Sequence, residues 1–288
     1  MKAVVSKISN GLGNQLFQFA TGYALSKRLG CPLDLDVSWY REDQTGLNTL
    51  RDLGITKIVP QHLYRKVLGF SKADLLRDRT VRVFSGTWRQ SFRHSVPIWV
   101  DEHPNFGSFS QICTPVCIMG VPVNFNSFED ILGELRENVV ERLGCLTALP
   151  QIAEDFAYVH VRLGDYVSSP EVACKMASLN SNYYAEGMRT YEQKHGKAKW
   201  ILCSNEPKNA LELMPKNMDV EISQGRSEID DLLLMARSKG GVIANSTFSL
   251  WGGLLSETNG GSIVAPKTWE KTNPPPPMPN TWNIIENM

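Results

Sequence analysis

The chain has 288 residues with thirty basic and thirty acidic side chains, so its formal net charge is zero. This balance gives no reason to expect a nucleic acid or a charged membrane surface as a general partner. Apolar residues make up 42% of the chain and charged residues 21%, which is typical of a globular protein of one large domain or two compact ones.

The chain begins with a pattern that predicts a strand, a glycine turn and a helix. Apolar and β-branched residues predict the strand over 3–8, and apolar residues at helical spacing predict the helix over 16–29. The two glycines of the turn between them allow a ligand to approach the backbone closely. Asn14 in this turn presents a neutral amide that suits a hydroxyl-rich sugar, or it simply caps the helix.

A second strand is predicted over 33–36, where Asp34 and Asp36 alternate with leucines. The two carboxylates share a face of the strand and match the Asp-x-Asp pattern with which many sugar transferases hold a metal ion. We do not assign a metal site to this pair, because it lies so early in the chain. Farther along, Trp88 and Trp99 flank a basic stretch. In a sugar-handling protein, these tryptophans and the charged groups between them would form a wall of the acceptor site; the alternative is that the tryptophans pack in the core.

The second half of the chain shows a regular alternation of strands and helices. An amphipathic helix is predicted over 126–143, and the best candidate linker is 146–154. The strands then predicted are 156–161, 200–203, 220–222, 242–244 and 263–265, and the helices are 183–195, 207–213, 228–238 and 248–255. Such alternation predicts an α/β fold with a parallel sheet and right-handed crossovers. The tail after the prolines at 274–277 is expected to pack back on the body.

Polar side chains follow three of these predicted strands. They are His160, Arg162 and Asp165 after the first strand, Asn205 and Glu206 after the second, and Asn245, Ser246, Thr247 and Phe248 after the fourth. Because ligands of open α/β sheets bind at the carboxyl ends of the strands, we expect these groups to converge on one site.

The residue types suit a diphosphate. The fork of Arg162 can grip phosphate in a bidentate way, and a helix start with Ser246 and Thr247 forms an anion site. The simpler alternatives are that Arg162 and Asp165 form only a loop ion pair, that His160 is a hydrogen-bonded core histidine, and that the two hydroxyls only cap the helix.

Three stretches, in this order, carry a resemblance to a known family. They are Gly11-Leu-Gly-Asn-Gln-Leu-Phe-Gln-Phe-Ala20, His160-x-Arg162-x-Gly164-Asp165-Tyr166 and Ile243-Ala-Asn-Ser-Thr-Phe-Ser-Leu-Trp-Gly-Gly253. Together they resemble the α-1,2-fucosyltransferases of glycosyltransferase family 11. The resemblance implies the GT-B fold, with two Rossmann-like domains that face a cleft. We expect an acceptor domain over 1–150 and a GDP-fucose-binding domain over 151–288.

The resemblance also implies roles for the polar groups. Arg162 would grip the diphosphate of GDP-fucose, Ser246, Thr247 and Phe248 would complete the cradle with His160 and Asn245, and Asn205 or Glu206 would bind the guanine edge. The sequence departs from the family at two points: it has Asn205-Glu206 in place of an aspartate pair, and Leu250-Trp251 in place of Trp-Trp.

The implied reaction moves fucose from GDP-β-L-fucose to the 2-hydroxyl of a terminal galactose, with inversion. Asp165 is a candidate base for the acceptor hydroxyl, or it holds Arg162 in place, and Asn14 would orient the acceptor or the fucose. The family has no metal site at its Asp-x-Asp position, so we expect neither a cofactor nor a metal. The alternatives are a transferase with another GDP-sugar or fucosyl linkage, and a non-catalytic sugar- or nucleotide-binding protein.

The start of the chain bears on its location. The stretch Met1–Lys7 is too short and interrupted for a signal peptide, and no apolar run approaches the roughly 20 residues that span a bilayer. Animal members of the family are anchored in the Golgi. We therefore expect a bacterial cytoplasmic enzyme, with peripheral contact at the inner membrane face if its acceptor is lipid-linked.

Overall fold

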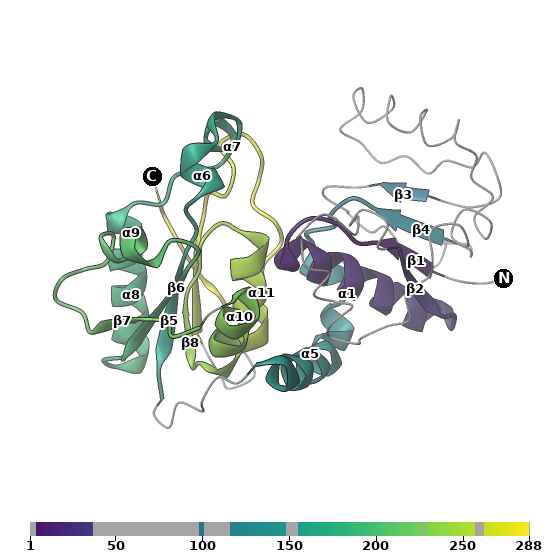
Figure 1. Cartoon of the computed structure of the whole chain (residues 1–288), viewed down its shortest axis with the longest axis horizontal. Helices are drawn as coiled ribbons and strands as arrows, with labels where there is room; N and C mark the ends of the chain where they lie inside the picture. Colours follow the sequence, from purple (N-terminus) through teal and green to yellow (C-terminus); the bar gives the residue numbers. More distant parts are fainter. Residues whose placement is uncertain are drawn as a thin grey trace. The chain divides into compact units, whose positions relative to one another are not determined.

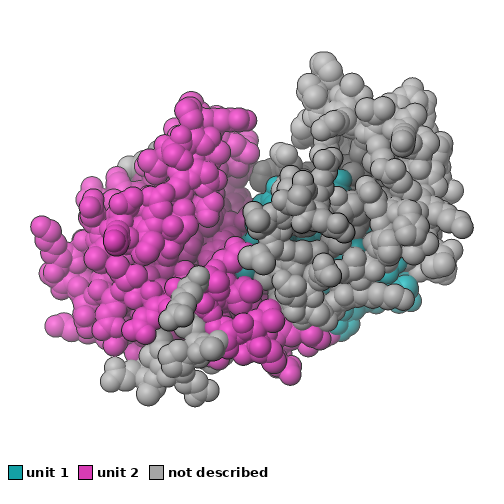
Figure 2. Space-filling view, viewed as in Figure 1, with its two compact units in different colours: residues 1–132 teal, residues 133–288 magenta. Residues whose placement is uncertain are grey.

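The chain forms two compact units in a computed structural model, residues 1–132 and 133–288 (Figures 1 and 2). The structure describes residues 4–36, 98–100, 116–147, 155–225, 227–256 and 262–287. Trp88 lies outside these ranges and only the backbone of Trp99 is described, so the expected acceptor wall stays a prediction.

The first unit contains a four-stranded parallel sheet in the order β2-β1-β4-β3. Its elements are β1 (Val4–Lys7), α1 (Leu12–Leu29), β2 (Leu33–Asp36), β3 (Ile98–Val100), β4 (Val116–Met119) and the short 3-10 turns η2 (Phe125–Ser127) and η3 (Glu129–Ile131). The strand–helix–strand order at the start of the chain is therefore confirmed.

Helix α1 begins at Leu12 rather than at the predicted residue 16, because Gly11 in extended conformation ends the turn before it. The buried side chain of Gln18 fastens the helix to that turn. Its amide nitrogen donates to the Ser9 hydroxyl at 2.9 Å and to the Gly120 carbonyl at 2.8 Å, and its oxygen accepts from the Ser9 backbone N–H. A helix glutamine thus joins the β1–α1 turn to the end of β4.

The second unit contains a six-stranded parallel sheet in the order β10-β9-β8-β5-β6-β7. The strands are β5 (Ala157–Val161), β6 (Trp200–Ser204), β7 (Val220–Ile222), β8 (Gly240–Val242), β9 (Ser262–Pro266) and β10 (Asn283–Ile285). The helices are α5 (Leu132–Leu146), α6 (Asp165–Ser168), α7 (Pro170–Lys175), α8 (Ser181–His195), α9 (Pro207–Leu211), α10 (Glu228–Arg237) and α11 (Thr247–Ser256).

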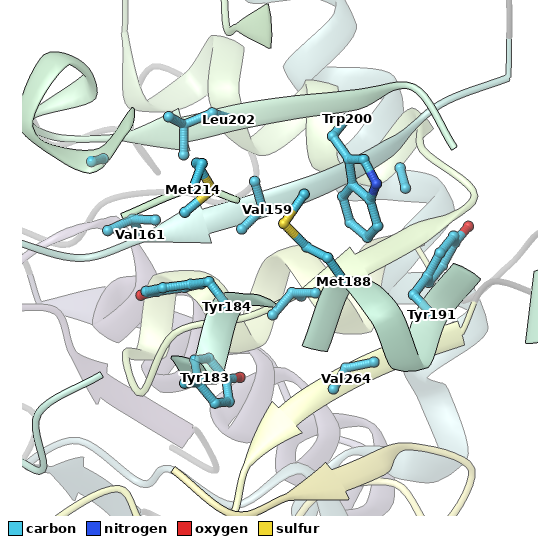
Figure 3. Packing of buried hydrophobic residues seen from close by; sticks show 13 residues of the cluster. Val159, Val161, Tyr183, Tyr184, Met188, Tyr191, Trp200, Leu202, Met214 and Val264 are labelled. Carbon is cyan, nitrogen blue, oxygen red and sulfur yellow. The ribbon is translucent and has the colours of Figure 1, made fainter. Parts of the chain in front are cut away.

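Helices cover both faces of this sheet, with α8 on one face and α10 and α11 on the other (Figure 1). Residues of β5 alternate accordingly: Val159 and Val161 join the cluster against α8, where Tyr184 and Met188 pack on them (Figure 3). Each such fully buried side chain contributes about 1.5–3 kcal/mol to folding. Gly187 lets α8 lie close, since a Cβ there would come within 2.8 Å of the Val242 side chain.

The winding of the second sheet reverses beside β5. The chain passes from β5 to β6 and β7, then returns through α10 to β8 on the other side of β5 and continues outward to β9 and β10. β5 and β8 are hydrogen-bonded neighbours, with Val159 opposite Val242. In open α/β sheets, ligands bind beyond the carboxyl ends of the two strands at such a switch point.

The division between the units falls at Leu132 and Gly133, earlier than the expected boundary near residue 150. Helix α5 therefore belongs almost entirely to the second unit, and hydrogen bonds join it to α11 and the residue after it to α10. The Arg136 Nε donates to the Leu254 carbonyl at 3.0 Å, and the Thr147 hydroxyl just after α5 donates to the Asp230 carboxylate.

The α/β fold with two Rossmann-like units, as expected for GT-B, is confirmed by the two parallel sheets. The C-terminal tail forms β10, which pairs with β9 through Ile284 and Ala265. Among the described residues, no helix combines the length and the apolar character needed to cross a bilayer.

Candidate functional site

Arg162 lies directly after β5, at the switch point. Its Nη2 donates to the Asp165 carboxylate at 2.7 Å, and its guanidinium lies 5.5 Å from the centre of the Tyr166 ring. The two charged side chains are 34% and 49% exposed, so the pair contributes at most about 1 kcal/mol to folding. The loop ion pair considered from the sequence is therefore present, and it leaves the guanidinium accessible to an anion.

Asn205 and Glu206 lie directly after β6, the neighbour of β5. The Asn205 Oδ1 accepts from the Leu163 backbone N–H at 3.0 Å. The Glu206 Oε2 accepts from the Asn209 amide at 2.8 Å, and the Glu206 backbone N–H donates to the Ser204 hydroxyl at 3.1 Å. The structure therefore brings this pair beside the loop that carries Arg162.

Asn245 follows β8 and is buried, with 2% of its surface exposed. Its amide nitrogen donates to the backbone carbonyls of Ala177 at 2.8 Å and Trp269 at 2.9 Å. Both amide hydrogens therefore bind the protein itself. Asn245 holds the loop together, and any direct contact with a ligand would have to use other atoms.

Helix α11 begins at this loop. The Ser246 Oγ accepts from the Ser249 backbone N–H at 3.1 Å, which is the capping role considered from the sequence. Thr247 and Phe248 form the first turn, half-buried, and that turn carries no acidic side chain. The positive end of the helix dipole therefore faces the site without an opposing carboxylate from its own first turn.

His160 lies near the end of β5 and is 4% exposed. Its ring centroid is 5.3 Å from that of Phe248, and its Nδ1 has no hydrogen-bond partner among the described residues. Burial lowers the pKa of His160 to about 3, and the positive charge of Arg162 acts in the same direction. The imidazole is therefore neutral and buried, as a core histidine would be, but its Nδ1 is not hydrogen-bonded within the described part of the chain.

Tyr166 connects the two loops of the switch point. Its hydroxyl donates to the Asn245 backbone carbonyl at 3.2 Å, while its ring lies under Arg162. Burial raises the pKa of Tyr166 to about 12, so the hydroxyl keeps its proton. No role for Tyr166 was predicted from the sequence, although the residue stands in the same short motif as Arg162.

Asn14 belongs to the first unit, whereas every other predicted site residue belongs to the second. It is the third residue of α1 and half-buried, and its backbone N–H donates to the Gly11 carbonyl at 3.0 Å. Gly11 occupies the N-cap position, so the interpretation of Asn14 as the helix cap is wrong.

Asp34 is half-buried on β2, and only the backbone of Asp36 is described. No group of three or more His, Cys, Asp or Glu side chains with the spacing of a metal site occurs in the part of the chain that the structure describes.

The sequence and the fold were compared with those of known proteins. The model of Glycosyl transferase family 11 matches residues 122–274, a stretch that holds all the predicted site residues of the second unit. The "Alpha-1,2-colitosyltransferase" of Escherichia coli is 26% identical over 99% of this chain and 100% of that protein. The "O-antigen biosynthesis glycosyltransferase WbnK" of Escherichia coli is 25% identical over 92% and 94%.

Among solved structures, the fucosyltransferase NodZ from Bradyrhizobium has a TM-score of 0.45 at 14% identity, and the match covers 88% of this chain and 93% of that chain.

Proposed function

This chain belongs to glycosyl transferase family 11, and from that premise we propose that it is an inverting α-1,2-fucosyltransferase. Its donor is GDP-β-L-fucose, and its acceptor is the 2-hydroxyl of a terminal galactose on a glycan. The first unit provides most of the acceptor site and the second unit the donor site. We also propose that the protein acts in the cytoplasm, the location expected from the sequence.

One observation carries the proposal. Arg162 after β5 and the first turn of α11 after β8 lie at the switch point, joined by the hydrogen bond from Tyr166 to Asn245. A guanidinium and a helix N-terminus together neutralise a diphosphate through charge-assisted hydrogen bonds. We propose that they hold the diphosphate of the donor and need no metal ion.

The reaction requires in-line attack by the acceptor hydroxyl on a centre with oxocarbenium character. Negative charge grows on the leaving diphosphate as its bond to fucose breaks. Arg162 then binds more strongly in the transition state than in the ground state, which is the condition for catalysis. Because the Asp165 carboxylate is engaged with Arg162 at 2.7 Å, we assign it the role of holding that guanidinium.

The positions of three further residues suggest the remaining contacts with the donor. Phe248, beside His160, packs on the nucleoside, and the Thr247 hydroxyl at the start of α11 completes the diphosphate cradle. The Glu206 carboxylate suits guanine, because it can accept from the N1–H and the 2-amino group together. Adenine offers no such pair of donors, so a carboxylate here distinguishes the two bases.

A second candidate is the transfer of another sugar from its GDP derivative with the same linkage. The similarity to a protein named alpha-1,2-colitosyltransferase favours a colitosyl group as that sugar. The contacts proposed for the diphosphate and for guanine are common to both donors, so they do not separate the two candidates.

The test is incubation of the purified chain with lactose and either GDP-fucose or GDP-colitose, followed by linkage analysis of the product by NMR. We expect an α-1,2-fucosylated product and a higher kcat/KM for GDP-fucose. A clear preference for GDP-colitose would establish the second candidate. GDP binding without any product, across a panel of galactose-terminated acceptors, would indicate a binding protein.

A further inference from the structure

The side chain of Asn205 lies against the turn that carries Arg162. β5 and β6 are parallel neighbours with Val161 opposite Ser204, so Arg162 and Asn205 leave the sheet side by side. The Asn205 Oδ1 accepts from the Leu163 backbone N–H at 3.0 Å. The Leu163 nitrogen belongs to the same peptide plane as the Arg162 carbonyl, so this bond fixes the direction in which the chain leaves Arg162.

Gly164 completes the turn in a conformation that Asn205 also shapes. Its φ is +66°, which side-chain-bearing residues rarely adopt, and a Cβ there would lie 2.5 Å from the Asn205 Nδ2. The asparagine amide thus occupies the space that a side chain at position 164 would need. Asp165 and Tyr166, which contact the guanidinium of Arg162, come directly after this glycine.

We propose that Asn205 is a positioning residue, which holds the turn 162–166 so that Arg162 meets the donor diphosphate, and that it does not bind the base. This inference rests on the proposed function. The Asn205 carbonyl oxygen is already bound to the backbone of Leu163, and its amide nitrogen is packed against Gly164. Both polar atoms of the Asn205 side chain therefore lie at the turn 162–166 itself.

The effect should appear in ligand binding far more than in folding. Asn205 is exposed, and water replaces a lost hydrogen bond at an exposed site with little change in stability. A small displacement of a group that grips a reacting phosphate, in contrast, lowers its contribution strongly.

The experiment compares Asn205→Ala and Asn205→Asp with wild type, by calorimetry with GDP and with inorganic pyrophosphate. Asn217→Ala, an exposed asparagine in the turn after α9, is the matched control. For Asn205→Ala we expect both ligands to bind about tenfold more weakly, by the same factor, because the shared diphosphate contact is affected. Asn205→Asp keeps an acceptor oxygen for the Leu163 N–H but adds a negative charge beside the proposed anion site, so it should keep the Leu163 bond while binding pyrophosphate more weakly than wild type.

A second measurement tests whether Asn205 affects pyrophosphate binding through Arg162. In an Arg162→Lys background, Asn205→Ala should change pyrophosphate affinity much less than it does in wild type, because coupled residues are not additive. Hydrogen exchange at the Leu163 amide should be faster in Asn205→Ala than in Asn205→Asp. Equal effects in the two backgrounds would show that Asn205 acts independently of Arg162.

Other outcomes overturn the inference as clearly. Weaker GDP binding with unchanged pyrophosphate binding would assign Asn205 to the base, and unchanged affinity for both ligands would leave it with no positioning role. If wild type binds neither ligand, the diphosphate site itself is absent. If the expected binding pattern appears but no fucosyl transfer is found, the proposed function fails while the positioning role stands.

Discussion

Arg162 and Asp165 lie on either side of Gly164, and their side chains meet at 2.7 Å because the glycine turns the chain with φ at +66°. The ion pair holds the guanidinium against the turn that follows β5 while leaving the Arg162 side chain 34% exposed. A fixed and accessible guanidinium is what recognition of a diphosphate requires, since its fork must be in place before the ligand arrives.

Arg162→Lys should lower kcat about a hundredfold, because an ammonium cannot reproduce the bidentate contact, and the loss corresponds to roughly 3 kcal/mol of transition-state stabilisation. Steady-state kinetics with GDP-fucose measures this effect. The control is Arg189→Lys on α8, where Arg189 also forms an exposed ion pair, with Glu186. Wild-type turnover in a folded Arg162→Lys variant would refute the assignment.

Tyr166→Phe should impair transfer while lowering stability by only about 1 kcal/mol, the typical net value of one hydrogen bond. The lost bond joins the loop after β5 to the Asn245 carbonyl. The matched control is Tyr191→Phe on α8, since the Tyr191 hydroxyl also donates to a backbone carbonyl, that of Lys239, at 3.1 Å. Melting curves should shift similarly in the two variants, and only Tyr166→Phe should lose activity. Equal kinetics would make Tyr166 purely structural.

The free energy of unfolding should fall as the pH is lowered from about 6.5 toward 3. The pKa of His160 is lowered to about 3 in the folded state, against about 6.5 in the unfolded chain, so the unfolded state binds the extra proton in this window. The contribution reaches at most about 1.4 kcal/mol per pH unit. Urea titrations between pH 7 and 4.5 should give a shallower decline for His160→Gln, and parallel curves would contradict this prediction.

Transfer activity should survive EDTA, because we propose that Arg162 and the N-terminus of α11 neutralise the leaving diphosphate. The measurement is the initial rate with and without chelator, in enzyme that has been dialysed against it. Loss of activity that Mn²⁺ or Mg²⁺ restores would return Asp34 and Asp36 as candidate ligands.

Asn14→Ala should reduce the transfer rate while leaving the calorimetric affinity for GDP unchanged, because Asn14 lies in the first unit and the proposed donor residues lie in the second. Gly11 caps α1, so no loss of a helix cap is expected in the melting curve. A shift in melting temperature with a normal rate would limit Asn14 to a structural role.

Local patterns in the sequence predicted most helices and strands of the second unit, but not α6, α7 or β10. The strand predicted over 156–161 is β5 at Ala157–Val161, and the helix predicted over 228–238 is α10 at Glu228–Arg237. Periodicity is a local property, and it also placed Arg162, Asn205 and Asn245 at the ends of strands. The parallel sheet followed from the alternation alone.

The tertiary structure decided which strand ends are neighbours. Local periodicity alone does not predict that β8 pairs with β5, or that Tyr166 reaches Asn245, 79 residues away. The tertiary structure also brings the Asn205 Oδ1 into a hydrogen bond with the Leu163 backbone N–H. It leaves the Nδ1 of His160 without a partner in the described part of the chain. These features depend on the order of strands across the sheet, which long-range packing selects and which local residue preferences leave open.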